Sequence, residues 1–168
     1  SLGFSSSRTA YFHNSLGGYH GAKPALLQDV YDFYLKQQDS VVLDMLNVKF
    51  IIDDQYADGV KKRPSALGSV WFVDEVIQVA SANEAILKLN KINHTMQALS
   101  QTIKPVAYNP METDTIVLVE KRNNLLRYTV STTHERLAVF SEMYYPSGWS
   151  LEIDGTPQNV HKVNYMLR

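Results

Sequence analysis

Apolar residues recur at helical spacing in the first part of the chain. From Pro24 they stand three or four positions apart, with polar residues between them, over about residues 24–38. This pattern is typical of a helix that buries one side, and proline suits the first turn because its missing N–H is not needed there. A second short helix is expected directly after, capped by the Ser40 hydroxyl.

A third helix is predicted over about residues 82–92. Ser81 and Glu84 have the spacing of a capping box, in which each side chain satisfies a free N–H at the start of a helix. The apolar residues at helical spacing that should form its buried side are Ile86, Leu87, Leu89 and Ile92.

Two apolar stretches between these helices predict strands. Residues 48–53 are almost continuously apolar, which indicates a short central strand buried on both faces. Residues 69–79 are rich in β-branched and aromatic side chains and predict a strand that bends at Asp74. The polar residues 53–68 are expected to form a loop, and residues 93–114 favour no regular element.

From Thr115 onward the apolar residues alternate with polar ones, which predicts strands. Asp154-Gly155 and Asn123-Asn124 fall between two strands each, and these residue types suit hairpin turns because they tolerate positive φ. The predicted strands cover residues 115–121, 125–132, 136–145, 149–154 and 159–167.

These patterns together predict an α+β protein with two lobes. Residues 1–105 should form a lobe of helices, about 24–38 and 82–92, against a small sheet. Residues 106–168 should form an antiparallel, β-sandwich-like sheet. About fifty residues in short strands cannot close a sandwich alone, so this sheet needs a cover from the first lobe or from further strands.

Composition narrows the functional classes. The net charge of −1 gives no basic field for nucleic acid, and the chain has no cysteine for disulfides or thiolate metal sites. Its five histidines lack the spacing of a zinc site, so we predict no metal and no other cofactor. No apolar run approaches the ~20 residues of a membrane helix.

Aromatic residues supply the best candidates for a binding surface. Tyr144, Tyr145 and Trp149 surround a Pro-Ser-Gly bend, and aromatic rings held on a rigid corner can stack on sugars. Tyr19 and His20 are further candidates for glycan contacts. They lie in a glycine-rich segment shortly after His13. The alternative is structural: the corner aromatics wedge the sheet against the helices.

No catalytic residues are predicted. The neighbouring acidic pairs at residues 53–54 and 74–75 would point to opposite faces of a strand, and no GxSxG elbow is present. Residues 17–23 lack the GxxxxGK[ST] spacing of a phosphate loop. A hydrolase would require distant acidic residues and histidines to converge in a cleft.

Several segments resemble those of one bacterial membrane protein family. The segments are RTAYFHNSLGGYHGAKPALLQDVYDF, VLDMLNVKFII, ALGSVWFVDEV, LAVFSEMYYPSGWSLEIDG and NYMLR, in this order along most of the chain. The chain is similar to the extracytoplasmic C-terminal region of the YfhO-like integral membrane proteins, in their Bacteroidetes form.

This resemblance implies a parent protein with many membrane helices, similar to glycosyltransferases that use lipid-linked sugars. In such proteins the catalytic acidic residue lies in an early extracytoplasmic loop, to which nothing here corresponds. Family members continue past the segment matched by NYMLR into another strand and a last membrane helix. The resemblance therefore implies that the C-terminal lobe is truncated in this chain.

The leading hypothesis is therefore a non-catalytic periplasmic domain of such a membrane protein in the cell envelope. It would position a glycan acceptor or brace the transmembrane part, which would be its main partner. The alternative is a free-standing carbohydrate-binding or adhesion module. Neither hypothesis involves nucleic acid.

Overall fold

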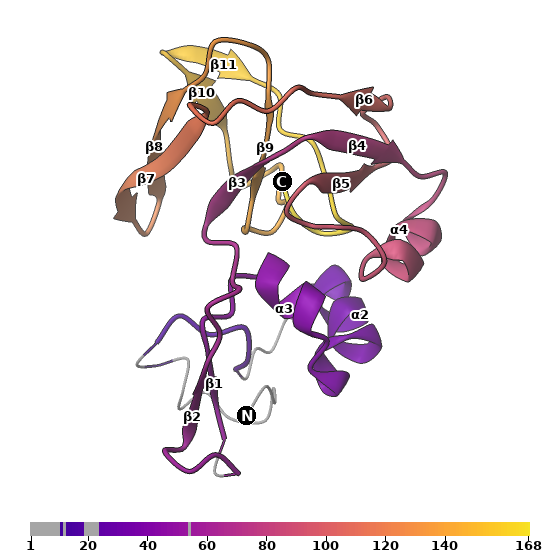
Figure 1. The fold of residues 1–168 in the computed structure, drawn as a ribbon, viewed down its shortest axis with the longest axis vertical. Coiled ribbons are helices and arrows are strands. Elements are labelled where there is room, and N and C mark those ends of the chain that lie inside the picture. The colour runs from indigo at the N-terminus through magenta and orange to yellow at the C-terminus, as the bar shows by residue number, and fades with distance from the viewer. Residues whose placement is uncertain (1–10, 12, 19–23, 54) are drawn as a thin grey trace. The chain divides into compact units, whose positions relative to one another are not determined.

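The chain folds into two compact units, residues 1–66 and residues 67–168. The computed structural model describes residues 11, 13–18, 24–53 and 55–168. Helices are few and most strand pairs are antiparallel, so the predicted α+β class is confirmed (Figure 1).

The first unit contains the predicted one-sided helix. Helix α2 (Ala25–Phe33) is followed by the 3₁₀ turn η1 (Leu35–Gln37), and the two are separated by Tyr34, whose φ of −132° leaves the helical region. Val30, Tyr34 and Leu35 are buried, so one side of this segment faces a core, as the spacing predicted.

The second predicted helix is present, but its cap is different. Helix α3 (Ser40–Met45) begins with Ser40 already inside it, and Asp39 is the N-cap residue. The Asp39 carboxylate accepts hydrogen bonds from the N–H groups of Val41 and Val42, at 3.0 and 3.1 Å. The prediction that Ser40 caps this helix is therefore wrong, because a carboxylate one position earlier satisfies the free N–H groups.

The strand predicted at residues 48–53 is shorter and more exposed than expected. Strand β1 (Phe50–Ile52) pairs only with β2 (Val60–Lys62), in an antiparallel two-stranded sheet. Ile51 is buried, but Phe50 is 55% exposed, so the predicted burial on both faces is wrong. Strand β2 lies in the polar segment expected to be a loop. Its two lysines interrupt the apolar pattern from which a strand is predicted.

In the second unit, the predicted bend at Asp74 is confirmed. Strand β3 (Val70–Val73) pairs antiparallel with β9 (Leu137–Phe140). Directly after Asp74, β4 (Glu75–Gln78) pairs parallel with β5 (Gln97–Ser100) and antiparallel with β6 (Val106–Ala107). These pairings join strands from both sides of residue 105, where the sequence predicted the lobe boundary.

Helix α4 (Ala82–Lys88) begins at the predicted cap. The Ser81 hydroxyl accepts a hydrogen bond from the Glu84 N–H at 3.1 Å, and the Glu84 carboxylate accepts one from the Ala80 N–H at 2.7 Å. Ile86 and Leu89 are buried as expected, but Leu87 is 54% exposed, so its predicted place on the buried side is wrong.

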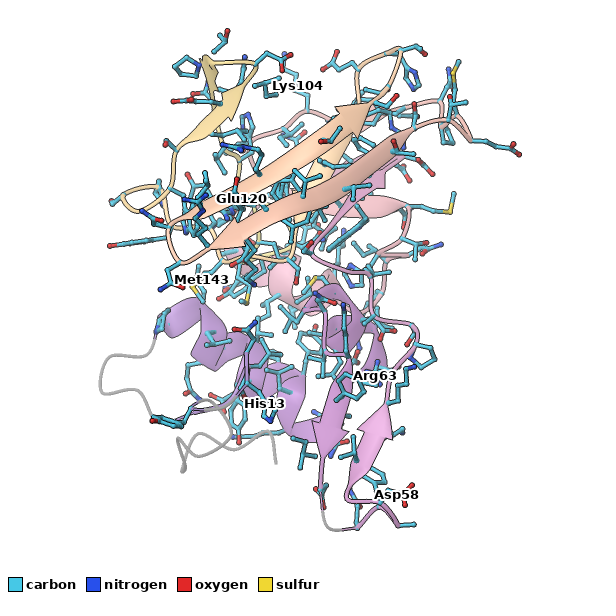
Figure 2. The ribbon with its side chains drawn as sticks, turned by 90° about the vertical axis from the view of Figure 1, so that its left-hand side faces the viewer. His13, Asp58, Arg63, Lys104, Glu120 and Met143 are labelled. Atoms are coloured by element: carbon cyan, nitrogen blue, oxygen red, sulfur yellow. The ribbon has the colours of Figure 1, made fainter. Side chains whose placement is uncertain are left out.

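Two hairpins complete the regular structure of this unit. Strand β7 (Thr115–Arg122) pairs with β8 (Leu125–Ser131), and β10 (Leu151–Ile153) pairs with β11 (Thr156–Gln158). The Asp154-Gly155 turn has φ values of 50° and 78°, which confirms the positive-φ turn predicted there. Glu120 on the first hairpin, labelled in Figure 2, forms ion pairs with Arg122 and Arg127.

The last predicted strand, at residues 159–167, is wrong. Residues 163–167 instead form a buried tight turn, in which Asn164 and Tyr165 have φ values of 47° and 69°. Val163 and Leu167 exchange both backbone hydrogen bonds at 2.9 Å. We call residues 163–167 the terminal turn. It lies between β5 and the segment after β9, because Val163 bridges to Ser100 and Leu167 to Met143.

Candidate functional site

One groove in the second unit brings together side chains from three separate segments. Its volume is about 330 Å³, at the low end of the ~300–1,000 Å³ typical of small-ligand sites. It is lined by Gln101, Thr102, Tyr144, Val160, His161 and Lys162. We call it the Tyr144 groove.

The Gln101-Thr102 wall is held by a serine at the end of β5. The buried Ser100 hydroxyl accepts hydrogen bonds from the N–H groups of Thr102 and Ile103, at 3.2 and 3.1 Å. Because the Ser100 backbone also bridges to Val163, this wall is fastened to the terminal turn.

The other two walls are fastened to the same turn. The Tyr144 N–H donates to the Met166 carbonyl at 2.8 Å. Lys162 directly precedes Val163, which is buried and paired with Leu167. The backbone of all three walls is therefore connected to one buried turn, which limits how far the walls can move apart.

Asn164 fixes the terminal turn against β5. Its side-chain oxygen accepts a hydrogen bond from the Leu99 N–H at 2.9 Å, and its own N–H donates to the Leu99 carbonyl at 2.9 Å. The asparagine is fully buried, and its side chain imitates the backbone of a neighbouring strand. The Asn164–Leu99 contact takes the place of the strand pairing that a strand at residues 159–167 would have made.

The Tyr144 groove carries positive charge and no carboxylate among its lining residues. His161 is exposed and Lys162 is half-buried. Among the ion pairs formed by the described residues, none includes His161 or Lys162. The positive charge of Lys162 is therefore not matched by an ion pair with an acidic side chain of the described residues.

The structure separates the three candidate aromatics of the corner. Only Tyr144 lines the groove. Tyr145 is 60% exposed, and its ring approaches Gly148 so closely that a Cβ there would lie 2.3 Å from a ring carbon. Trp149 is covered by the Arg168 guanidinium, 4.1 Å from the ring centroid, and burial lowers the pKa of Arg168. The other candidates, Tyr19 and His20, lie outside the described residues.

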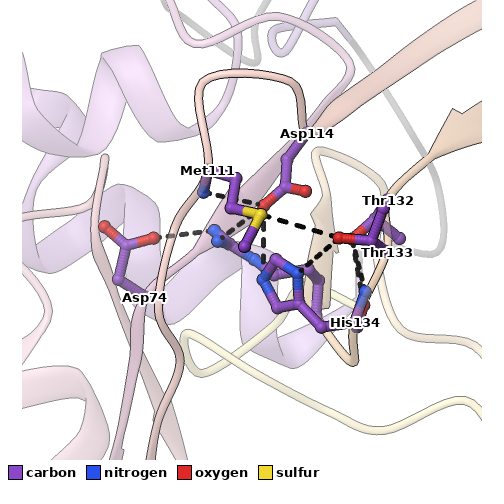
Figure 3. Close-up of polar contacts among 7 residues, drawn as sticks. Asp74, Met111, Asp114, Thr132, Thr133 and His134 are labelled. Atoms are coloured by element: carbon purple, nitrogen blue, oxygen red, sulfur yellow. Dashed lines mark hydrogen bonds and ion pairs between the residues drawn. The ribbon is translucent and has the colours of Figure 1, made fainter.

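A second polar cluster gathers distant charged residues around Arg136. Figure 3 shows its members Asp74, Asp114 and His134. The guanidinium contacts the Asp74 carboxylate at 2.7 Å and the Asp114 carboxylate at 3.0 Å, and its side chain is only 3% exposed. It also lies 5.3 Å from the ring centroid of Phe72. One buried cation thus joins the bend between β3 and β4 to the residue preceding β7.

Asp114 is held in its ionised form within this cluster. Burial alone would raise the pKa of its carboxyl group, but the Met111 N–H and the charges of His134 and Arg136 outweigh this effect and lower it. The Met111 N–H donates to the carboxylate at 3.1 Å.

The same cluster places a hydroxyl, an imidazole and a carboxylate in series. The Thr133 hydroxyl lies 3.5 Å from Nδ1 of His134, whose Nε2 lies 3.5 Å from the Asp114 carboxylate. Both distances exceed the ~2.6–3.2 Å of an activated nucleophile. The Asp114 oxygen nearest the imidazole is also bound to Arg136 and Met111, and the Tyr144 groove is lined by other residues. This geometry is that of a structural ion-pair network.

Searches for other kinds of site and for relatives gave no match. The described residues contain no group of three or more His, Cys, Asp or Glu side chains arranged to hold a metal ion. No helix in the described part of the chain is long and apolar enough to cross a membrane. Neither family models, nor curated proteins, nor solved structures match this chain.

The sequence identified only one of the residues that form the groove. Tyr144 was a candidate because of its aromatic neighbours, whereas Gln101 and Thr102 lie in a segment that favoured no element. His161 and Lys162 lie in residues 159–167, for which the sequence predicts a strand that does not form. No local signal could have joined these segments, because the terminal turn that unites them depends on long-range pairing.

Proposed function

We propose that this chain is a non-catalytic, extracytoplasmic domain that positions a glycan acceptor for a multi-pass membrane protein. The sequence segments that resemble the YfhO-like family supply the setting. The observation that carries the binding role is the Tyr144 groove, in which the terminal turn brings an aromatic ring and polar side chains from three segments together. The parent protein would resemble a glycosyltransferase that uses lipid-linked sugars, and its transmembrane part would be the main partner of this domain.

The groove offers the chemistry that sugars require. An aromatic ring such as that of Tyr144 can stack on the apolar face of a pyranose. The Gln101 amide and the Thr102 hydroxyl can both donate and accept hydrogen bonds, which matches the hydroxyl groups of a sugar. These side chains provide binding and orientation, and the chemical step would belong to the membrane part.

Titration of the full chain with a panel of cell-envelope saccharides tests this role. We expect binding that Tyr144→Ala weakens about three- to tenfold, the value of an aromatic contact. Tyr145→Ala is the matched control, since Tyr145 is exposed outside the groove and should bind as the unmodified chain does. Binding that both variants retain in full would place the site elsewhere. No binding at all would leave only the bracing role.

A free-standing carbohydrate-binding module is the second candidate. It is favoured by one observation: every lining residue of the groove belongs to residues 67–168, so no other part of a larger protein is needed to form it. The reading frame that encodes this chain distinguishes the two. Membrane helices encoded beside it agree with the proposed function, whereas a secreted protein without them agrees with the module.

A further inference from the structure

The two basic residues of the Tyr144 groove point to the kind of saccharide that it takes. We propose that the groove binds an anionic saccharide, one that carries a carboxylate or a phosphate beside the ring that contacts Tyr144. This inference rests on the proposed glycan-binding function and adds a charge requirement to it.

The arrangement of charge in the groove carries the inference. His161 and Lys162 are adjacent in the chain and both line the groove, with no acidic residue among the lining side chains. Neither takes part in the ion pairs of the described residues, although the chain as a whole carries a net charge of −1. The groove is therefore a local positive site on a nearly neutral protein, which attracts an anion and disfavours a cation.

The backbone of Lys162 is held beside that of Tyr144. Its backbone is fixed by the neighbouring Val163, which is buried in the terminal turn, while its side chain is half-buried at the groove. Tyr144 is fixed to the same turn through its N–H bond to Met166. The backbones that carry the aromatic ring and the lysine side chain are therefore held by the same turn, and both residues line one groove, which suits a ligand with an apolar ring face and an anionic substituent.

Matched neutral and acidic sugars test the proposal. We would titrate the full chain with galactose against galacturonate, with glucose against glucuronate and glucose 6-phosphate, and with inorganic phosphate alone. Oligosaccharides of the same pairs would extend the range of affinity, and calorimetry or backbone amide shifts would report binding. We expect at least one acidic sugar to bind about tenfold more tightly than its neutral partner, and added salt to reduce this preference.

Variants of the two basic residues show whether they cause the preference for acidic sugars. Lys162→Gln and His161→Gln should each weaken binding of the acidic sugar about three- to tenfold and leave the neutral sugar within about twofold. Lys104→Gln is the matched control: this exposed lysine, labelled in Figure 2, lies in the same loop as Gln101 and Thr102 but does not line the groove. It should not change either affinity.

The outcomes separate this inference from the proposed function. Equal affinity for neutral and acidic sugars, still sensitive to Tyr144→Ala, overturns the charge requirement and keeps the glycan site. If inorganic phosphate binds as tightly as glucose 6-phosphate, the sugar ring adds no affinity, and the proposal that the ligand is a saccharide is overturned. An equal loss in Lys104→Gln overturns the assignment to this groove. Failure of every sugar overturns the proposed function itself. Comparison of the uronates with glucose 6-phosphate shows whether the site prefers a carboxylate or a phosphate.

Discussion

Tyr144, Tyr145 and Trp149 stand close together in the sequence, yet each has a different neighbour. Tyr144 faces the groove, Tyr145 packs over Gly148, and Trp149 stacks against Arg168. A Cβ at position 148 would lie 2.3 Å from a ring carbon of Tyr145, so a larger residue there would require the exposed Tyr145 ring to move. The Pro-Ser-Gly bend thus directs three aromatic rings to three environments, and only one of them is free to meet a ligand in the groove.

The buried Arg136 should contribute more to thermal stability than the exposed Arg127. Arg136 is 3% exposed and compensates two carboxylates, so Arg136→Gln should leave Asp114 in a buried site with less compensation. We expect its thermal unfolding midpoint to fall by about 5 °C or more. Arg127 is the matched control, because its side chain is 65% exposed where it pairs with Glu120.

Arg127→Gln should change the midpoint by no more than about 2 °C, since exposed ion pairs contribute little. Calorimetry of the two variants under the same conditions provides the comparison. Equal shifts for both arginines would contradict the structural role that we assign to the Arg136 cluster.

At the scale of elements, the sequence predicted what depends on local chemistry. The Asp154-Gly155 turn, the Ser81 cap and the bend at Asp74 all form as predicted, because each requires only neighbouring residues. The exposure of β1 could not be predicted from neighbouring residues, because it depends on which strand pairs with β1. Its apolar run satisfies the pattern of a buried strand, but among the described strands it pairs with the lysine-containing β2 alone.

The terminal turn shows the limit of pattern analysis most clearly. Residues 159–167 alternate like a strand, yet Asn164 and Tyr165 adopt positive φ and reverse the chain. Asparagine tolerates this conformation, but it costs Tyr165 about 1–2 kcal/mol, and the long-range pairing of the turn with Leu99 and Met143 offsets that cost. The groove depends on this turn, which is why most of its residues were missed.

Substitution of Asn164 tests whether the turn supports the groove. Asn164→Ala removes the acceptor for the buried Leu99 N–H and keeps a Cβ at positive φ, so we expect a loss of about 2–4 kcal/mol in the free energy of unfolding. Asn164→Gly loses the same hydrogen bond but tolerates the φ, and should be about 1 kcal/mol more stable than the alanine variant. Denaturant unfolding measures both, and an alanine variant as stable as the unmodified chain would contradict the role of this contact.

At the scale of the whole molecule, strand pairing in the second unit returns to its starting point. Strand β3 continues into β4, β4 pairs with β5, and β5 meets the terminal turn through Ser100. The turn in turn meets Met143, which follows β9, and β9 pairs with β3. This closed series uses strands from both sides of residue 105, so it gives residues 67–168 a continuous hydrogen-bonded frame of their own.

Two fragments distinguish this organisation from the boundary predicted at residue 105. Residues 67–168 contain every strand pairing of the closed series, together with a buried core that includes Val73, Leu99 and Val139. We therefore expect this fragment to unfold cooperatively and to retain the saccharide affinity of the full chain.

Residues 106–168 keep β9 but lose β3, and they keep the terminal turn but lose Leu99 and Ser100. The buried Asn164 would then lose both of its hydrogen bonds to Leu99, and we expect that two hairpins with β9 do not offset that cost because β9 has lost its partner strand. This shorter fragment should show neither a cooperative transition nor protected amides. If it folds as well as the longer one, the boundary at residue 105 is the true one, and the Tyr144 groove cannot owe its rigidity to β5.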